Sequence, residues 1–174
     1  SLEIARTPLL FVQAVALAFK RKDGGNDPPE WKTNEGDRSI RAEQAYSLLD
    51  TCSILPGIKG DGSIDADALQ KWIVETRSLC ATHGREEIGD QMIGQLLAKC
   101  PDGSDGIWPH ETVRDVLEVV GTLHIARGMH MARYNARGAH FRARRGNEER
   151  KIAEQYHASA RSIAFTAPFT SRLL

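Results

Sequence analysis

Residues 95–117 have the sequence QLLAKCPDGSDGIWPHETVRDVL, and residues 47–73 have the sequence SLLDTCSILPGIKGDGSIDADALQKWI. Each stretch begins with an apolar segment containing Cys, continues through a loop with an Asp-Gly pair, and ends with apolar residues at three- and four-residue spacing. This spacing is typical of helices that bury one face. When four residues are left out of the longer loop the stretches align, so that Leu69 corresponds to Val113, Trp72 to Val116 and Ile73 to Leu117. The sequence therefore predicts an all-α fold that contains two similar helix–loop–helix units.

An Asp-Gly loop between two helices invites comparison with the calcium-binding EF-hand. With each Asp-Gly glycine at the sixth loop position, Asp61 and Asp105 are the only carboxylates among the first three ligand positions of their loops. The twelfth position, where an EF-hand has a bidentate Glu, holds Ala68 in one loop and Thr112 in the other. We therefore expect no metal in these loops and interpret the Asp-Gly pairs as turns.

Helical spacing extends the two units to four helices, at about 39–52, 65–80, 85–99 and 109–123. In the first of these, the residues expected to face inward are Ile40, Ala45, Leu48, Leu49 and Cys52.

Two more helices are predicted at the ends of the chain. Thr7-Pro8 is typical of a helix start and precedes an apolar run, so a helix is predicted from Pro8 to about Lys22. Because the run 8–19 is apolar almost all round, we expect this helix at the centre of the core. Another helix begins at the cap Asn147. The predicted architecture is an irregular bundle of about six helices.

Two stretches have too many helix-breaking or polar residues for a regular period. Residues 23–38 predict a surface loop, and residues 124–147 predict a basic, loop-rich segment.

Length and composition predict a single domain over residues 1–174, with ordinary contents of hydrophobic (41%) and charged (26%) residues. The chain begins with Ser1 instead of Met, so we expect a fragment of a larger protein. Three cysteines without a CxxC pair favour buried thiols and a cytoplasmic location. The apolar run 8–19 is shorter than the about 20 residues that cross a bilayer, so no membrane contact is expected.

The charge is balanced overall but unevenly distributed along the chain. Residues 23–118 hold 19 acids against 9 Lys and Arg, whereas residues 119–174 hold 3 acids against 10. Six arginines and no acid lie between Arg127 and Arg145, interleaved with Tyr, Phe and His. Guanidinium groups pair with carboxylate or phosphate and stack on aromatic rings.

Three hypotheses account for these arginines: internal ties to the acidic part of the chain, which we favour, a nucleic-acid-binding surface, and a site for an anionic substrate built on Arg137 and His140. The candidate anion-binding residues are Arg133, Arg137, His140, Arg142, Arg144 and Arg145. The sequence contains no GxSxG, HExxH, P-loop or GxGxxG pattern, so no catalytic residue and no cofactor is predicted.

The run YNARGAHF at 134–141, followed by AEQY at 153–156, resembles a recurring segment near the carboxy terminus of long, uncharacterised bacterial proteins. The Asp-Gly units upstream look similar as well. The resemblance implies a domain of a larger bacterial protein and implies no activity. We therefore predict a non-catalytic helical interaction or scaffolding module. Its expected partners are other domains of the parent protein or a separate protein. A nucleic-acid-binding module using residues 127–145 is the alternative, and an enzyme acting on an anionic substrate is the third hypothesis.

Calcium should leave the thermal unfolding midpoint unchanged, because neither loop has enough carboxylate ligands. A bound ligand at about 100 times its Kd would add about 2.7 kcal/mol to the free energy of unfolding, which calorimetry detects easily. A clear rise in the midpoint with calcium, absent with the same concentration of sodium, would contradict the ligand count.

Overall fold

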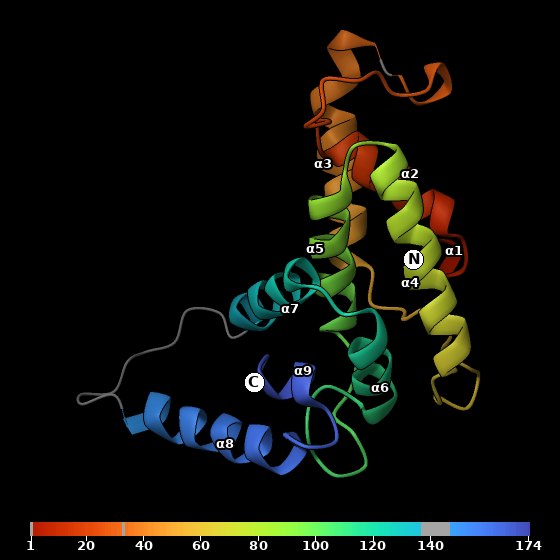
Figure 1. Cartoon of the computed structure of the whole chain (residues 1–174). Coiled ribbons are helices and arrows are strands. Elements are labelled where there is room, and N and C mark those ends of the chain that lie inside the picture. Colours follow the sequence, from red (N-terminus) through yellow and green to blue (C-terminus); the bar gives the residue numbers. More distant parts are fainter. Residues whose placement is uncertain (1, 33, 137–146) are drawn as a thin grey trace.

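The computed structural model describes residues 2–32, 34–136 and 147–174, and within these ranges the chain forms helices and no β-strand (Figure 1). The long helices are α2 (Pro8–Ala18), α3 (Arg38–Thr51), α4 (Ala66–Thr82), α5 (Glu86–Leu97), α6 (Glu111–Val120), α7 (Leu123–Ala136) and α8 (Asn147–Ile163). Short helices lie at α1 (Leu2–Arg6), α9 (Pro168–Ser171), η1 (Pro29–Trp31) and η2 (Glu35–Asp37). The predicted all-α class is confirmed. Seven of the described helices have seven or more residues, against about six expected.

The two Asp-Gly loops share one hydrogen-bonding pattern. Asp61 Oδ1 accepts the backbone N–H of Ser63 at 2.9 Å, and Asp105 Oδ1 accepts that of Ile107 at 3.0 Å. In both loops the glycine after the Asp has a positive φ, +85° for Gly62 and +73° for the second glycine. These are the turns that the Asp-Gly pairs predict.

A cationic side chain contacts the carboxylates of each loop. Lys59 Nζ lies 3.2 Å from Asp65 Oδ2 in the first loop. In the second, Nη2 of the buried Arg114 lies 2.7 Å from Asp105 Oδ2 and 3.9 Å from Glu111 Oε2. Positive charge is therefore already present where a bound metal ion would meet these carboxylates.

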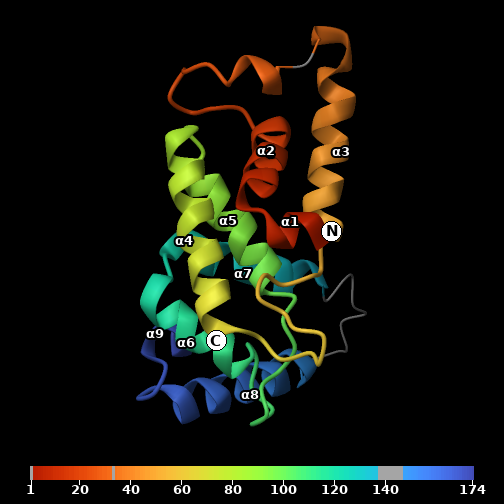
Figure 2. The same ribbon diagram turned by 90° about the vertical axis from the view of Figure 1, so that its right-hand side faces the viewer.

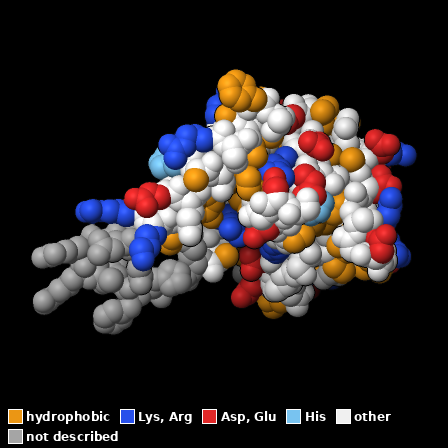
Figure 3. Space-filling view, turned by 90° about the horizontal axis from the view of Figure 1, so that it is seen from below, with side chains coloured by type: hydrophobic (Ala, Val, Ile, Leu, Met, Phe, Trp, Pro, Cys, Tyr) orange, Lys and Arg blue, Asp and Glu red, His pale blue; other side chains and the backbone are white. Residues whose placement is uncertain are grey.

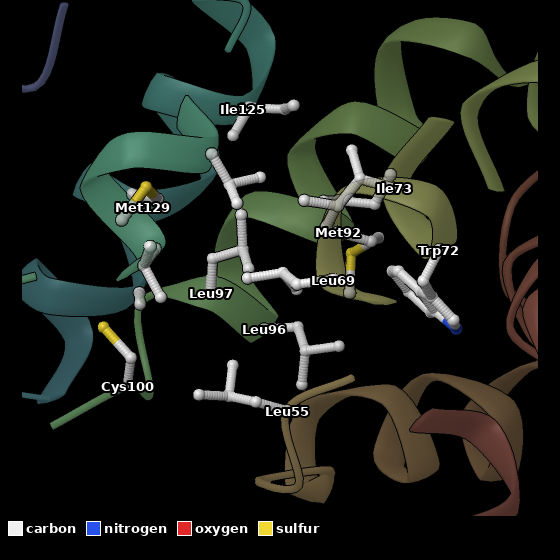
Figure 4. Packing of buried hydrophobic residues seen from close by; sticks show 14 of the residues in the cluster. Leu55, Leu69, Trp72, Ile73, Met92, Leu96, Leu97, Cys100, Ile125 and Met129 are labelled. Carbon is white, nitrogen blue, oxygen red and sulfur yellow. The ribbon is translucent and has the colours of Figure 1, made fainter. Parts of the chain in front are cut away.

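Helix α5 has the largest buried share of any long helix, with seven of its twelve residues buried. Figure 4 shows side chains of α4, α5 and α7 meeting in one apolar cluster, with Trp72 on the side that faces α2. The labelled members include Leu69, Met92, Leu96, Leu97, Ile125 and Met129.

Two glycines let α5 and α7 approach backbone to backbone. A Cβ on Gly94 would overlap the carbonyl oxygen of Ile125, and a Cβ on Gly128 would overlap that of Gln91. Only glycine fits at such a close helix contact.

The prediction of a loop-rich segment at 124–147 is wrong for residues up to 136, which belong to α7. The apolar stripe of α7 is narrow and could not be recognised among polar residues, glycines and arginines. In this stripe Ile125 and Met129 lie one turn apart and are fully buried. The stripe is narrow because Gly128, which has no side chain, makes a close backbone contact with α5.

The apolar sequence of α2 predicted that this helix lies at the centre of the core. This prediction is wrong. Phe11 and Val15 are buried against the bundle, but Leu9 and Leu10 are 43% and 38% exposed. The helix also ends at Ala18 and not near Lys22. Among the described residues, Leu9 and Leu10 therefore lie on a side of α2 that is only partly covered.

The sequence predicted a wider buried face for α3 than the structure has. Ala45, Leu49 and Cys52 are buried, whereas Ile40 and Leu48 are 58% and 42% exposed. The helix stands at the edge of the bundle (Figure 2), so its apolar residues away from α2 have no partner among the described residues.

The buried guanidinium of Arg85 connects three separate segments. It donates to the carbonyl oxygens of Ala16 at 3.1 Å, Phe19 at 3.1 and 3.2 Å, and His83 at 2.7 Å. Both of its terminal nitrogens also bond the carboxylate of Asp27. Arg85 thereby joins the end of α2, the segment that follows it, and the turn between α4 and α5.

The carboxylate of Glu118 on α6 holds the end of the chain. It accepts the backbone N–H groups of Phe169 at 2.8 Å and Thr170 at 2.9 Å, at the start of α9. The Phe169 ring packs where a Cβ of Gly121 would lie. Helices α8 and α9 therefore lie at the opposite end of the molecule from residues 19–38 (Figure 1).

In the described ranges, no helix combines the length and the apolar character needed to cross a membrane.

Replacing Phe11 with Ala should lower the free energy of unfolding by about 3–5 kcal/mol, the usual cost of removing a buried aromatic ring. Phe11 is 2% exposed and meets the Trp72 ring edge-on at 5.1 Å. Leu10→Ala on the exposed side is the control and should cost less than about 1 kcal/mol in urea unfolding. A loss as small for Phe11→Ala as for Leu10→Ala would contradict the place of Phe11 in the core.

Replacing Arg85 with Met should cost about 2–3 kcal/mol, because three carbonyl groups and Asp27 lose their donor. The Asp27 side chain is 27% exposed and can be partly hydrated, which keeps the loss below that of a fully buried pair. Urea unfolding measures the change, with Arg41→Met as the exposed control, expected within about 0.5 kcal/mol of the parent. A neutral Arg85→Met would mean that the end of α2 is held in another way.

Candidate binding groove beside Arg133

Of the candidate anion-binding residues, Arg133 on α7 lies in the described part of the chain. The others, Arg137, His140, Arg142, Arg144 and Arg145, lie outside the described residues.

The guanidinium of Arg133 is held by aromatic groups. Its central carbon lies 4.6 Å from the ring centroid of Trp108, a cation–π arrangement. Its Nη2 donates to the hydroxyl of Tyr156 on α8 at 3.2 Å. No carboxylate among the described residues forms an ion pair with it. Arg133 is therefore a half-buried cation without an acidic partner in the described part of the chain, unlike Arg85 and Arg114.

Trp108 is itself fixed, which gives the guanidinium a firm base. The ring is 6% exposed, and its Nε1 donates to the carbonyl oxygen of Ala98 at 3.3 Å. Trp108 directly follows the second Asp-Gly loop, so the turn at Asp105 determines where its ring enters the core.

Two adjoining hollows lie beside Arg133, with volumes of about 450 and 280 Å³. Trp108, Arg133, Tyr156 and Leu174 line both of them. We call the two hollows together the Arg133 groove. The larger hollow is mostly apolar, with Ile152, Ala153 and Leu173 among its walls, and the smaller is more polar, with Gln155 and Ser159.

The end of the chain closes one side of the groove. His130 Nε2 donates to the carbonyl oxygen of Leu173 at 2.6 Å, and Leu173 is 5% exposed. Together with the capping by Glu118, this contact places the last residues against α7.

The charge around the groove is mixed. Glu149 lines the larger hollow and Asp102 the smaller one. Figure 3, which shows the molecule from below, has Lys and Arg interspersed with Asp and Glu on that face. The groove thus combines one central cation with acidic residues at its margins.

Ser159, His130 and His157 are among the residues that line the groove. Within the described ranges, Ser159 forms no hydrogen bond to His130 or His157, and no group of His, Cys, Asp and Glu could hold a metal ion. Burial raises the pKa of the Cys100 thiol to about 11 and that of the Cys80 thiol to about 12, so both remain protonated at neutral pH.

The sequence indicated Arg133 but not its surroundings. Interleaved arginines and aromatic residues drew attention to the segment, yet the ring that Arg133 stacks on comes from the loop before α6. No local pattern showed that the hydroxyl of Tyr156 would meet Arg133.

Comparisons of the chain with protein families, curated proteins and solved structures find no match, so the groove is interpreted from its own geometry.

Proposed function

We propose that this chain is a non-catalytic interaction module of a larger bacterial protein, and that the Arg133 groove binds a protein segment carrying a carboxylate next to an apolar side chain. The observation that supports this proposal is the position of Arg133, stacked on Trp108 between two hollows and without an ion-pair partner in the described ranges.

The expected carboxylate on the bound segment follows from the N–H groups of Arg133 that have no acceptor among the described residues. Nη2 bonds Tyr156, while Nε and Nη1 have no hydrogen-bond acceptor among the described residues. A planar guanidinium offers such N–H groups to both oxygens of a carboxylate at once. Because stacking on Trp108 already restrains the side chain, binding loses less rotamer entropy than it would at a free surface arginine.

The expected apolar side chain next to that carboxylate follows from the larger hollow. Its walls include Ile152, Ala153, Leu173 and Leu174, and about 450 Å³ accommodates one medium or large apolar side chain with room to spare. Burying such a side chain supplies the part of the affinity that a single ion pair cannot.

Glu149 and Asp102 favour a protein segment over a nucleic acid. A polyanion that contacted Arg133 along either hollow would meet one of these two carboxylates. Nucleic-acid modules usually present a basic face, whereas this chain has a formal net charge of zero.

A nucleic acid is the second candidate, favoured by one observation. The Tyr134 ring is 76% exposed directly beside Arg133 in the sequence, as expected for a base-stacking platform.

The proposal includes the setting of the module. We infer one domain built on two similar helix–loop–helix units, since their loops share the same turn, in the cytoplasm of a bacterial cell. The buried thiols of Cys80 and Cys100 support a reducing compartment.

Random peptides displayed on phage and selected against the chain should be enriched in sequences with Asp or Glu beside a large apolar residue. For a synthesised winner, Arg133→Gln should weaken binding at least about tenfold in fluorescence anisotropy, because a charge-assisted hydrogen bond contributes about 1.5–3 kcal/mol. Ala153→Trp, which fills the larger hollow from an exposed position, should weaken it similarly. Arg41→Gln, on the exposed side of α3, is the control and should bind like the parent.

Winners without an acidic residue, or equal binding by Arg133→Gln, would refute the carboxylate site. Short single-stranded and duplex nucleic acids should be tested in parallel at two salt concentrations. Binding that falls by orders of magnitude between about 50 and 200 mM salt would favour the second candidate.

A further inference from the structure

We propose that the hollow beneath residues 19–38 is a second binding site, for a small molecule that carries several negative charges beside an aromatic ring, as a nucleotide does. The site lies at the opposite end of the molecule from the Arg133 groove (Figure 1) and does not depend on it.

The hollow has a volume of about 940 Å³, larger than either part of the Arg133 groove. It lies between the last turn of α2, the first turn of α3 and the segment that connects them. Figure 2 shows residues 19–32 arching away from the end of α2. The volume of the hollow is in the range of small-molecule and cofactor sites.

Basic side chains dominate the charge of the lining. The lining contains five of them, Lys20, Arg21, Lys32, Arg38 and Arg85, whereas Asp27 is the one carboxylate among the described lining residues.

Two of these five cations are already neutralised. Arg85 bonds Asp27, and Arg21 bonds both oxygens of Asp23 at 2.6 and 2.7 Å.

The other three have no partner in the described ranges. Lys20, Lys32 and Arg38 form neither a hydrogen bond nor an ion pair with any described side chain. Three cations that line one hollow and have no partner among the described residues favour a ligand with more than one negative charge, because each additional charge gains from the same field.

Beside the polar residues Asn26 and Ser39, the lining has an apolar part that supplies a place for a ring. Ala16, Leu17 and Phe19 come from the end of α2, Ala42 from α3, and Trp31 from η1. Apolar surface of this kind can pack against an aromatic ring.

The walls are held in place without a ligand. Arg85, 2% exposed, fixes Asp27 against the end of α2, and the ring of Trp31 packs on that of His83 with centroids 4.4 Å apart. Asp23 Oδ1 also accepts the backbone N–H of Gly25 at 3.0 Å. A site formed before binding loses little conformational entropy when the ligand arrives.

Isothermal titration calorimetry on the whole chain should compare three probes: ATP, adenosine and inorganic tripolyphosphate. ATP should bind at one site and at least about tenfold more tightly than either fragment, because it has both the charge and the ring. Tripolyphosphate binding as tightly as ATP would overturn the proposal, since the cations would then attract any polyanion. Absence of ATP binding at millimolar concentration would overturn it too.

Two variants locate the binding. The double substitution Lys32→Gln with Arg38→Gln should weaken ATP binding at least about tenfold, whereas Lys71→Gln with Arg41→Gln, which removes the same charge elsewhere, should not. Ala42→Trp, which fills the hollow and leaves every charge in place, should also weaken it. Circular dichroism checks that each variant folds. Unchanged affinity in both the double variant and Ala42→Trp would place ATP outside this hollow.

Discussion

The guanidinium of Arg85 lies inside the protein with its hydrogen-bonding groups satisfied, and the arrangement of one end of the molecule depends on it. A buried charge is tolerated only when it is paired and fully hydrogen-bonded. Here the partners are backbone carbonyls at the end of α2 and beside the turn before α5, together with the carboxylate of Asp27. The same contact therefore ends α2, orders the segment after it and sets the start of the most buried helix.

Arg133 presents the opposite case, and the comparison explains how this protein uses its arginines. Arg85 and Arg114 are buried against carboxylates, which makes them structural. Arg133 rests on an indole ring and a hydroxyl, which hold its position without neutralising it. The hypothesis of internal ties fits Arg85 and Arg114, which lie outside the arginine-rich segment from which it arose. Arg133 is the one arginine of the candidate set in the described ranges, so for the arginine-rich segment the hypothesis of internal ties stays a prediction.

The helices of the two units were predictable because local and long-range preferences agree there. Leu69, Ile73, Val113 and Leu117 follow helical spacing, and their buried faces are wide enough to register as a period. Prediction failed where contacts between distant segments decide. Helix α7 packs through Gly128, whose lack of a side chain carries no periodic pattern, and α2 is apolar on a side that nothing described covers.

The candidate site was predictable to a similar degree. Arg133 stands out in the sequence because arginines and aromatic residues alternate around it. Its partners Trp108 and Tyr156 come from other elements, and no spacing rule connects them. Arg85 gave no indication of its role, since an arginine just before a helix is usually solvated.

The glycine contact between α5 and α7 has a consequence for the history of this protein. Surface residues, including those around the Arg133 groove and around the hollow beneath residues 19–38, can be exchanged as sequences diverge. Any side chain at Gly94 or Gly128, in contrast, would push two helices of the core apart. Descendants of a common ancestor should therefore retain this pair after their charges and loops have changed. In searches for distant relatives, the two glycines with the apolar residues Ile93 and Met129 beside them would be more informative than the arginine-rich segment.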